Sequence, residues 1–295
     1  MTERSPLRER AYAVLLAPYL VGLVLLVAVP TIWTVVLAFT EHDLVRPAEW
    51  VGIENFRELL DDPIFATSIR NSLLYVAYSV PLRVIGAVAL ALLLHRRFWG
   101  AGTARTAVCL PSLVPDVAYS LLWLWILNPL YGPLNVLLAA IGAPTPRWLT
   151  QPGAAQAAVI IMGAFQIGEG FLVAIATRQQ IPNEMYEVAT LEGAGPLNAF
   201  RRITLPLMAP TLVLLLFRDT IFSLQSSFVP ALIVTEGGPP PYATTFLPLF
   251  VYRNGFEYLR FGYASAATLL MLAVTAVIVF IQYRIVRRWR HALVV

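Results

Sequence analysis

Long apolar stretches separated by shorter polar segments dominate the pattern along the chain. Six of them stand out, at about residues 11–39, 71–94, 106–127, 154–177, 207–235 and 262–283. About 20 apolar residues in a helix match the hydrocarbon core of a bilayer, which is about 30 Å thick. The pattern therefore predicts an all-α polytopic protein with about six transmembrane helices, forming one transmembrane domain over residues 1–295 in a lipid bilayer.

Composition agrees with this prediction. Of the 295 residues, 58% are hydrophobic and 13% are charged, whereas soluble domains carry roughly 25% charged residues. The first apolar stretch is far longer than the h-region of a signal peptide, and no small-x-small cleavage site follows it. We therefore expect residues 11–39 to remain as a membrane helix.

The positions of the basic residues predict the orientation. All 21 are arginine, and the chain has no lysine. If the N-terminus lies inside, the inner segments hold 13 arginines, and the outer loops hold six arginines against nine acidic residues. This asymmetry obeys the positive-inside rule and predicts that both termini face the cytoplasm. It also accounts for the net charge of +4 without a nucleic-acid partner.

Several kinds of site are excluded by residues that the sequence lacks. A phosphate-binding P-loop needs a lysine, so any ATP hydrolysis must reside in another subunit. A single cysteine, Cys109, excludes an internal disulfide and a cysteine-based metal cluster. The three histidines lie in loops or in the tail without ligand spacing. We expect no metal site, no catalytic residue and no cofactor bound by this chain.

The inner segment 178–206 has the sequence of two short helices around a glycine break. Pro182 suits a first helical turn, Gly193 and Gly195 permit a sharp turn, and Pro196 can begin the second helix. Leu205-Pro206 is expected to end that helix. An ordinary amphipathic linker is the alternative interpretation.

This segment resembles the EAA loop of bacterial ATP-binding cassette (ABC) importers, in which Glu-Ala-Ala is followed by three intervening residues, a Gly and, further on, Ile-x-Leu-Pro. The matching residues are Glu187, Val188, Ala189, Gly193, Ile203, Leu205 and Pro206. Val188 replaces the usual Ala, and Glu192 replaces the usual Asp before the Gly. Further motifs resemble the maltose-type sugar and glycerol-phosphate permeases: residues 51–56, 131–135, 148–149, 235–239 and 261–266.

The resemblance implies the type I ABC importer permease fold and the maltose-F-like member of a permease pair. It implies a bacterial inner-membrane subunit that translocates a sugar or related polyhydroxylated solute. The implied partners are a second homologous permease, two ATPase subunits that bind ATP and Mg, and an extracytoplasmic solute-binding protein. The residues implied to contact the ATPase are Tyr186, Glu187, Val188, Ala189, Glu192 and Gly193.

Five ionisable residues fall near the middle of predicted helices: Arg83, Asp116, Glu169, Arg218 and Asp219. Each is costly in hydrocarbon, at least ~2.5 kcal/mol for an Arg or Asp at a helix centre. Arg218 and Asp219 point about 100° apart on a helix, so we do not expect them to pair with each other. For Arg83 and Arg218 we expect structural interhelical ion pairs, and a place along the pathway is the alternative.

Gln166 and Glu169 share a helix face beside small glycines, and Asp116 shares one with Tyr119 and Trp123. Carboxylates and amides beside aromatic planes suit a polyhydroxylated ligand. The resemblance to the maltose permease places ligand-contacting positions at Ser112, Asp116, Met162, Phe165, Gln166, Glu169, Leu224 and Ser227. Alternatively, these polar groups hold the helices together.

Two other classes of protein compete with a permease. An intramembrane protease or phosphatase would need a convergent Ser/His, paired Asp or metal-ligand set, which the sequence does not suggest. A stand-alone secondary transporter fits the intramembrane charges but leaves the EAA-like loop unexplained. The sequence does not name the solute, the ATPase or the binding protein.

Overall fold

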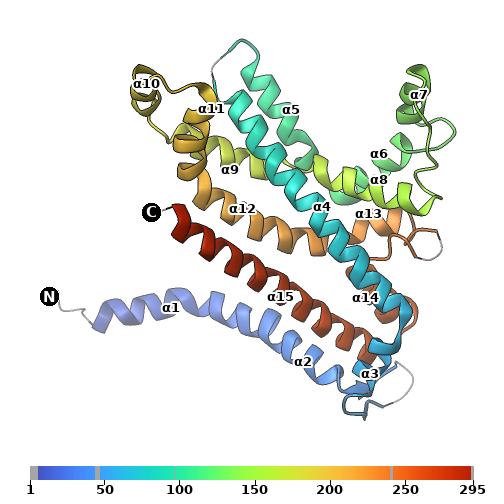
Figure 1. The fold of residues 1–295 in the computed structure, drawn as a ribbon. Helices are drawn as coiled ribbons and strands as arrows, with labels where there is room; N and C mark the ends of the chain where they lie inside the picture. The colour runs from blue at the N-terminus through green and yellow to red at the C-terminus, as the bar shows by residue number, and fades with distance from the viewer. Residues whose placement is uncertain (1–5, 44–46, 97, 240–241, 294–295) are drawn as a thin grey trace. The chain divides into compact units, whose positions relative to one another are not determined.

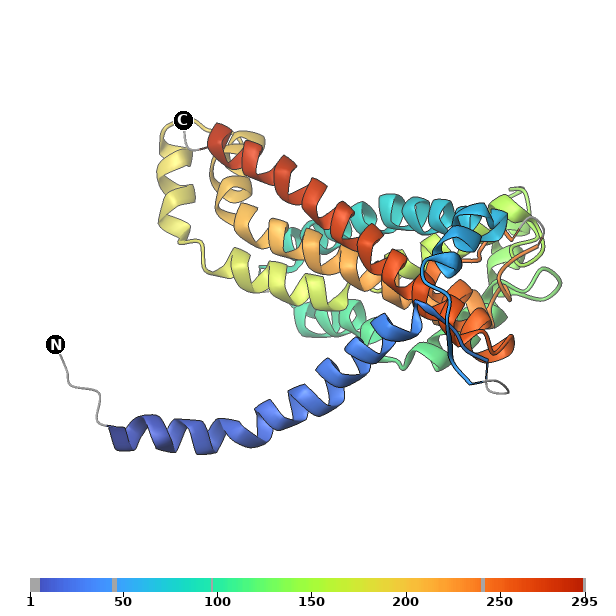
Figure 2. The same ribbon diagram turned by 90° about the horizontal axis from the view of Figure 1, so that it is seen from below.

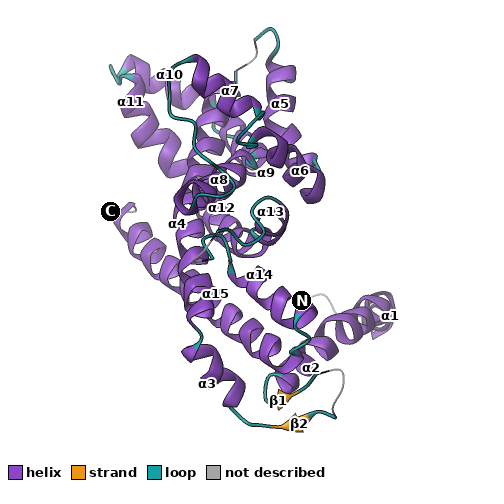
Figure 3. Cartoon of the chain, turned by 90° about the vertical axis from the view of Figure 1, so that its right-hand side faces the viewer, coloured by secondary structure: helices purple, strands orange, loops and turns teal. Residues whose placement is uncertain are grey.

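The computed structural model describes residues 6–43, 47–96, 98–239 and 242–293. Nearly every element within them is a helix, which confirms the predicted all-α class. Two short strands of two residues each, β1 (Thr40–Glu41) and β2 (Glu49–Trp50), form an antiparallel pair (Figure 3). Arg4, Arg46 and Arg97, which entered the arginine count, lie outside the described residues.

The chain forms two compact units. One comprises Met1–Asp62 and Val251–Leu270, and the other comprises Pro63–Phe250 and Met271–Val295. The last helix, α15 (Phe261–Leu293), contributes residues to both. The expectation of one transmembrane domain over residues 1–295 stays a prediction.

The first unit begins with a long apolar helix (Figure 2, dark blue). α1 (Pro6–Leu23), the π-helical turn η1 (Val24–Ala28) and α2 (Val29–Leu37) follow one another without a break. The stretch Leu15–Leu37 is a candidate span, and none of its most apolar window is buried in the chain. Such a helix, apolar on all sides, requires lipid or other membrane helices around it.

The remainder of the first unit is held together by polar contacts around α3 (Glu54–Asp61). Arg260 donates hydrogen bonds to both carboxylate oxygens of Glu58, at 2.6 and 2.5 Å. The hydroxyl of Tyr263 donates to Asp62 at 2.8 Å. These bonds fix the start of α15 against α3.

The second unit is a bundle in which α4, α9 and α12 lie side by side (Figure 1). Ala87 and Ala91 of α4, Phe171 of α9, and Met208 and Leu215 of α12 form its main apolar core. Two elements, α14 (Leu247–Tyr252) and η3 (Arg253–Glu257), lead from this unit into the first unit. The helices that precede them in this unit are α4 (Pro63–Leu94), α5 (Ala101–Leu113), α6 (Asp116–Ile126), α7 (Pro133–Ala140), α8 (Pro152–Phe165), α9 (Gly168–Gln179), α10 (Asn183–Leu191), α11 (Pro196–Ala199), α12 (Leu205–Ser226) and α13 (Phe228–Ile233).

Four helical stretches among the described residues are long and apolar enough to cross a membrane: Leu15–Leu37, Pro63–Leu94, Pro196–Ile233 and Phe261–Arg287. Two bent pairs raise the number to six if each pair is one span. α5 and α6 are bent by 102°, and α8 and α9 by 41°. The predicted segments 106–127 and 154–177 each contain one of these bends, which the apolar pattern alone did not indicate.

The expectation that Leu205-Pro206 ends a helix is wrong. α11 continues through a π-helical segment, η2 (Phe200–Thr204), directly into α12. The backbone N–H of Leu205 bonds to the carbonyl of Phe200, five residues back. Pro206 then occupies the first turn of α12. A wide turn of this kind accommodates a proline, because the chain does not need the N–H that proline lacks.

Candidate solute pathway and coupling helix

The two helix bends lie at residues that the sequence placed in a solute site. Ser112 and Asp116 flank the first, between α5 and α6. Phe165, Gln166 and Glu169 flank the second, between α8 and α9. Pro115 explains the first, because a proline disfavours the helical conformation of the residue before it. Non-helical backbone at membrane depth is tolerated where protein or a water-filled cavity surrounds it.

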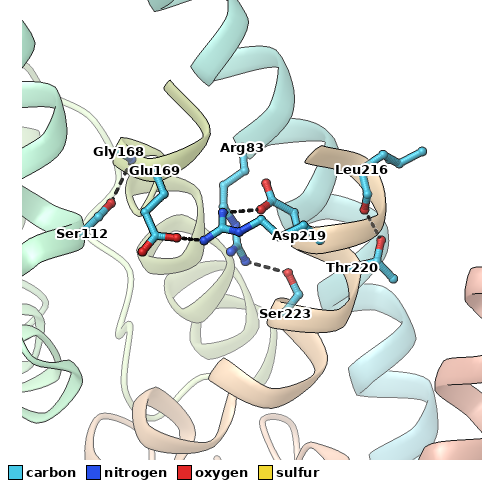
Figure 4. Close-up of polar contacts among 9 residues, drawn as sticks. Arg83, Ser112, Gly168, Glu169, Leu216, Asp219, Thr220 and Ser223 are labelled. Atoms are coloured by element: carbon cyan, nitrogen blue, oxygen red, sulfur yellow. Dashed lines mark hydrogen bonds and ion pairs between the residues drawn. The ribbon is translucent and has the colours of Figure 1, made fainter. Parts of the chain in front are cut away.

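A hydrogen bond joins the two breaks. The backbone N–H of Gly168 donates to the side-chain oxygen of Ser112 at 2.8 Å (Figure 4). A Cβ atom at position 168 would lie 2.7 Å from that oxygen and 2.9 Å from the Cα of Cys109. Only glycine therefore permits this close approach of α9 to α5.

Aromatic side chains lie next to the second break. The ring of Trp123 on α6 meets the ring of Phe165 edge-on, with centroids 5.4 Å apart. The Tyr119 hydroxyl donates to the backbone carbonyl of Met162 at 2.7 Å. Met162 is fully buried, whereas Phe165 is 56% exposed. α6 and α8 are therefore packed together and present an aromatic surface at the break.

The carboxylate of Glu169 on α9 forms an ion pair with Arg218 on α12. This is an interhelical pair of the kind expected for Arg218, and its partner is a residue that we had assigned to the solute site. Arg218 also bonds to Asp219, with its Nη1 2.9 Å from the carboxylate Oδ1. The expectation that these sequence neighbours do not pair is wrong, because the long arginine side chain bends back along the helix.

Arg83 on α4 has no carboxylate partner within ion-pair distance in the described part of the chain. It is 1% exposed, and its Nη2 donates to the Ser223 hydroxyl at 2.6 Å. The Nε and Nη1 atoms of Arg83 have no hydrogen-bond partner among the described residues. The expected ion pair of Arg83 is thus replaced by a hydrogen bond.

Sequence reasoning missed Phe222 and Ser223. The Phe222 ring lies 5.3 Å from the guanidinium carbon of Arg83 and 5.5 Å from that of Arg218. Phe222 follows Arg218 by four residues, and Ser223 follows Asp219 by four, so each pair shares one face of α12. That spacing was the available signal.

Three further predicted site residues are Leu224, Ser227 and Asp116. Leu224 is 2% exposed and packs with Val76 and Val80 of α4. Ser227 is 1% exposed, and its hydroxyl has no partner among the described residues. Asp116 is exposed at the start of α6. The structure joins the first break to the second through Ser112 and Gly168, next to Glu169, and a place in the solute site stays a prediction for all of these residues.

α10, the helix with the EAA-like sequence, projects at one end of the second unit, and α7 lies at the other (Figures 1 and 2). None of its residues is buried, and the large apolar side chains of Val188 and Leu191 are 54% and 88% exposed. Gly193 ends it with φ +78°, a conformation that favours glycine after a helix. The hydroxyls of Tyr186 and Thr204 share a 2.8 Å hydrogen bond, which ties α10 to η2, within the continuous helical stretch Pro196–Ile233.

A cavity of about 760 Å³ lies beside α10 and is lined by His95, Arg178, Tyr186 and Glu187, among others. The guanidinium carbon of Arg178 lies 4.4 Å from the ring centre of Tyr186, and its Nη2 lies 3.5 Å from Nε2 of His95. Burial lowers the pKa of His95, and the charge of Arg178 acts in the same direction. The ring is therefore held neutral, a form that can accept a hydrogen bond from Arg178.

Comparisons with known proteins agree with this arrangement. Residues 83–291 match the family described as "Binding-protein-dependent transport system inner membrane component". The sulfoquinovosyl glycerol transport system permease protein SmoG of Agrobacterium fabrum is 32% identical, over 95% of this chain and 92% of the relative. The probable ABC transporter permease protein YesP of Bacillus subtilis is 30% identical, over 94% and 90%.

A third relative, the sn-glycerol-3-phosphate permease protein UgpA of Yersinia pestis, is 29% identical over 82% of this chain and 81% of its own length. A chain in the crystal structure of a bacterial ABC transporter that imports the acidic polysaccharide alginate is 26% identical. It superposes with a TM-score of 0.83, over 95% of this chain and 96% of that one. Permeases of this family are not enzymes, and they work with a partner permease, an ATPase and a solute-binding protein. The chain therefore belongs to the sugar-type family of binding-protein-dependent ABC importer permeases, which are inner-membrane components.

Proposed function

We propose that this chain is the maltose-F-like permease subunit of an importer that moves a sugar or related polyhydroxylated solute into the cytoplasm. Two separate ATPase subunits bind ATP and Mg and hydrolyse the ATP. A second homologous permease completes the pathway, and an extracytoplasmic binding protein delivers the solute. The observation that carries this proposal is the exposed helix α10, which has the EAA-like sequence and is anchored to the helical stretch Pro196–Ile233 that contains α12.

The geometry of α10 suits transmission of force. An exposed helix with apolar side chains and the carboxylate of Glu187 offers a surface for a groove on a partner. The bond between Tyr186 and Thr204 links it to η2, and η2 continues without a break into α12. α12 carries Arg218, which pairs with Glu169 at the second helix break. Movement of α10 by the ATPase is thereby passed to the proposed solute site.

The solute side of the proposal rests on the two joined helix breaks. Discontinuous membrane helices form the solute sites of many transporters. The proposed solute-contacting residues are Ser112, Asp116, Phe165, Gln166, Glu169, Leu224 and Ser227. The names of the compared transporters mention sulfoquinovosyl glycerol, sn-glycerol-3-phosphate and the acidic polysaccharide alginate. All three solutes carry hydroxyl groups, which supports a polyhydroxylated solute here.

Both termini are proposed to face the cytoplasm, because 13 arginines then lie inside and six outside. In that orientation α10 also lies inside, where the ATPase would contact it. The predicted coupling residues are Tyr186, Glu187, Val188, Ala189, Glu192 and Gly193.

Reconstitution tests this function. The chain is assembled in proteoliposomes with the second permease and ATPase of the same bacterium, and its binding protein is added on the opposite side. Uptake of labelled sugars should require ATP on the side of α10 and should stop with a non-hydrolysable analogue. Uptake driven by an ion gradient without the ATPase would instead identify a secondary transporter.

A further inference from the structure

We propose that the transported solute is an anion, and that the Arg218 guanidinium, reinforced by Arg83, receives its negative group in exchange for the carboxylate of Glu169. The proposal rests on the proposed function, because it names the class of solute that the same site takes. The groups involved come from three helices, α4, α9 and α12, and meet at the second helix break (Figure 4).

The charges of the cluster balance only while Glu169 stays in place. The cluster holds two guanidinium groups, from Arg83 and Arg218, and two carboxylates, from Asp219 and Glu169, and both carboxylates pair with Arg218. The side chain of Asp219 is 4% exposed and is held at 2.9 Å from Arg218. The side chain of Glu169 is 62% exposed. If Glu169 turns away, two cations and one anion remain, so the vacated position has a net charge of about +1 and attracts one negative group.

Arg83 is the second positive charge of the cluster, and it is only partly paired. Burying a guanidinium with two unpaired nitrogens costs free energy of folding, because the buried donors lose their hydrogen bonds to water. A purely structural arginine is expected to have its N–H groups paired, yet Nε and Nη1 of Arg83 lack partners among the described atoms. The guanidinium carbons of Arg83 and Arg218 lie 5.3 and 5.5 Å from the same Phe222 ring centre. Arg83 therefore adds positive charge close to Arg218, which strengthens the attraction of this position for an anion.

Among possible solutes, an anion fits this cluster best. A neutral sugar would have to separate Arg218 from Glu169 without supplying a replacement charge. A cationic solute would meet the repulsion of two guanidinium groups. A carboxylate, phosphate or sulfonate replaces Glu169 one for one and can accept two parallel hydrogen bonds from Arg218. The released carboxylate of Glu169 then remains free to accept bonds from solute hydroxyls.

The test measures uptake by the reconstituted complex with matched acidic and neutral probes: digalacturonate and its dimethyl ester, and sn-glycerol-3-phosphate and glycerol. The complex should transport an acidic probe, and Arg218→Gln should reduce that uptake at least tenfold. Arg218→Lys keeps the charge and should retain more uptake than Arg218→Gln. The double variant Arg218→Gln with Glu169→Gln removes the pair without stranding Glu169 and should keep a normal yield of complex while failing to transport the acid.

Three outcomes overturn the inference. Normal uptake of an acidic probe by Arg218→Gln would show that Arg218 does not receive the charge. Equal loss of intact complex in Arg218→Gln and in the double variant would show that the cluster only holds the helices together. Uptake of neutral probes alone would exclude an anionic solute while leaving the proposed import function standing, whereas uptake of no sugar or polyol of either kind would contradict the import function itself.

Discussion

The side-chain oxygen of Ser112 accepts a hydrogen bond from the backbone N–H of Gly168 at 2.8 Å, so two interrupted helices meet at their interruptions. The bond satisfies one of the free N–H groups at the start of α9 with an acceptor from α5. The position of each break is thereby fixed by the other, and the residues around them form one local structure.

Gly168→Ala should destabilise this junction. The new Cβ would lie 2.7 Å from the Ser112 oxygen and 2.9 Å from the Cα of Cys109, so the helices must separate. We expect a loss of about 1–3 kcal/mol, typical of overpacking, measured by thermal unfolding of the detergent-solubilised chain. Gly153→Ala is the control, because a Cβ on Gly153 of α8 meets nothing within 4 Å. Equal stability of the two variants would contradict the close approach.

Much of this fold could be predicted from the apolar pattern, because membrane helices must be long and apolar. The breaks were harder to see. Pro115 and Gly168 were present as signals, but a break inside an apolar stretch does not change its hydropathy. The continuation through Pro206 was unpredictable from the proline itself, because proline ends some helices and begins others, and here the π-helical turn at 200–204 decides.

The candidate site could be predicted only in part. The residues near the breaks follow from polar side chains inside apolar stretches, which are rare and costly. Which charges pair does not follow from a single sequence, because Arg218 reaches both Asp219 on its own helix and Glu169 on another. Tertiary packing decides which carboxylate a long arginine side chain reaches, and the spacing of residues in the sequence does not encode that packing.

Topology can be tested by labelling single cysteines in a Cys109→Ala background. Cysteines at positions 49 and 146 should react with a membrane-impermeant maleimide added outside, and a cysteine at position 290 should react only after the membrane is opened. The arginine distribution is the physical reason, since basic loops remain in the cytoplasm. Labelling of position 290 from outside would refute the orientation.

Stability should depend on pH through His95. Burial lowers its pKa below the ordinary 6.5 in the folded chain, so the unfolded chain takes up a proton first as the pH falls. The neutral His95 ring therefore makes its full contribution to the free energy of unfolding above about pH 6.5, and this contribution is lost as the pH falls through the lowered pKa. The melting temperature should decrease less for His95→Gln than for the wild type between about pH 7.5 and 5.5. Parallel curves would rule out this role for His95.

Glu187→Lys and Gly193→Pro should uncouple the ATPase while leaving membrane insertion intact. The first reverses an exposed charge on α10, and the second places proline at φ +78°, which its ring forbids. Binding of the ATPase and ATP-driven uptake should both decrease strongly. Glu184→Lys makes the same charge change on the same helix outside the EAA-like residues and should have a much smaller effect. Wild-type transport by both test variants would mean that the loop is only a linker.

The most direct test of import through the helix breaks is to measure uptake together with the yield of intact complex for Glu169→Ala. Loss of a hydrogen bond to a charged group costs roughly 1.5–3 kcal/mol, so uptake should fall about tenfold to a hundredfold. Asp219 still pairs with Arg218 at 2.9 Å, so the yield and the ATP hydrolysis stimulated by the binding protein should persist. Asp116→Ala and Gln166→Ala should behave in the same way. A yield that falls in step with uptake would contradict the account, because these residues would then hold the helices together rather than bind the solute.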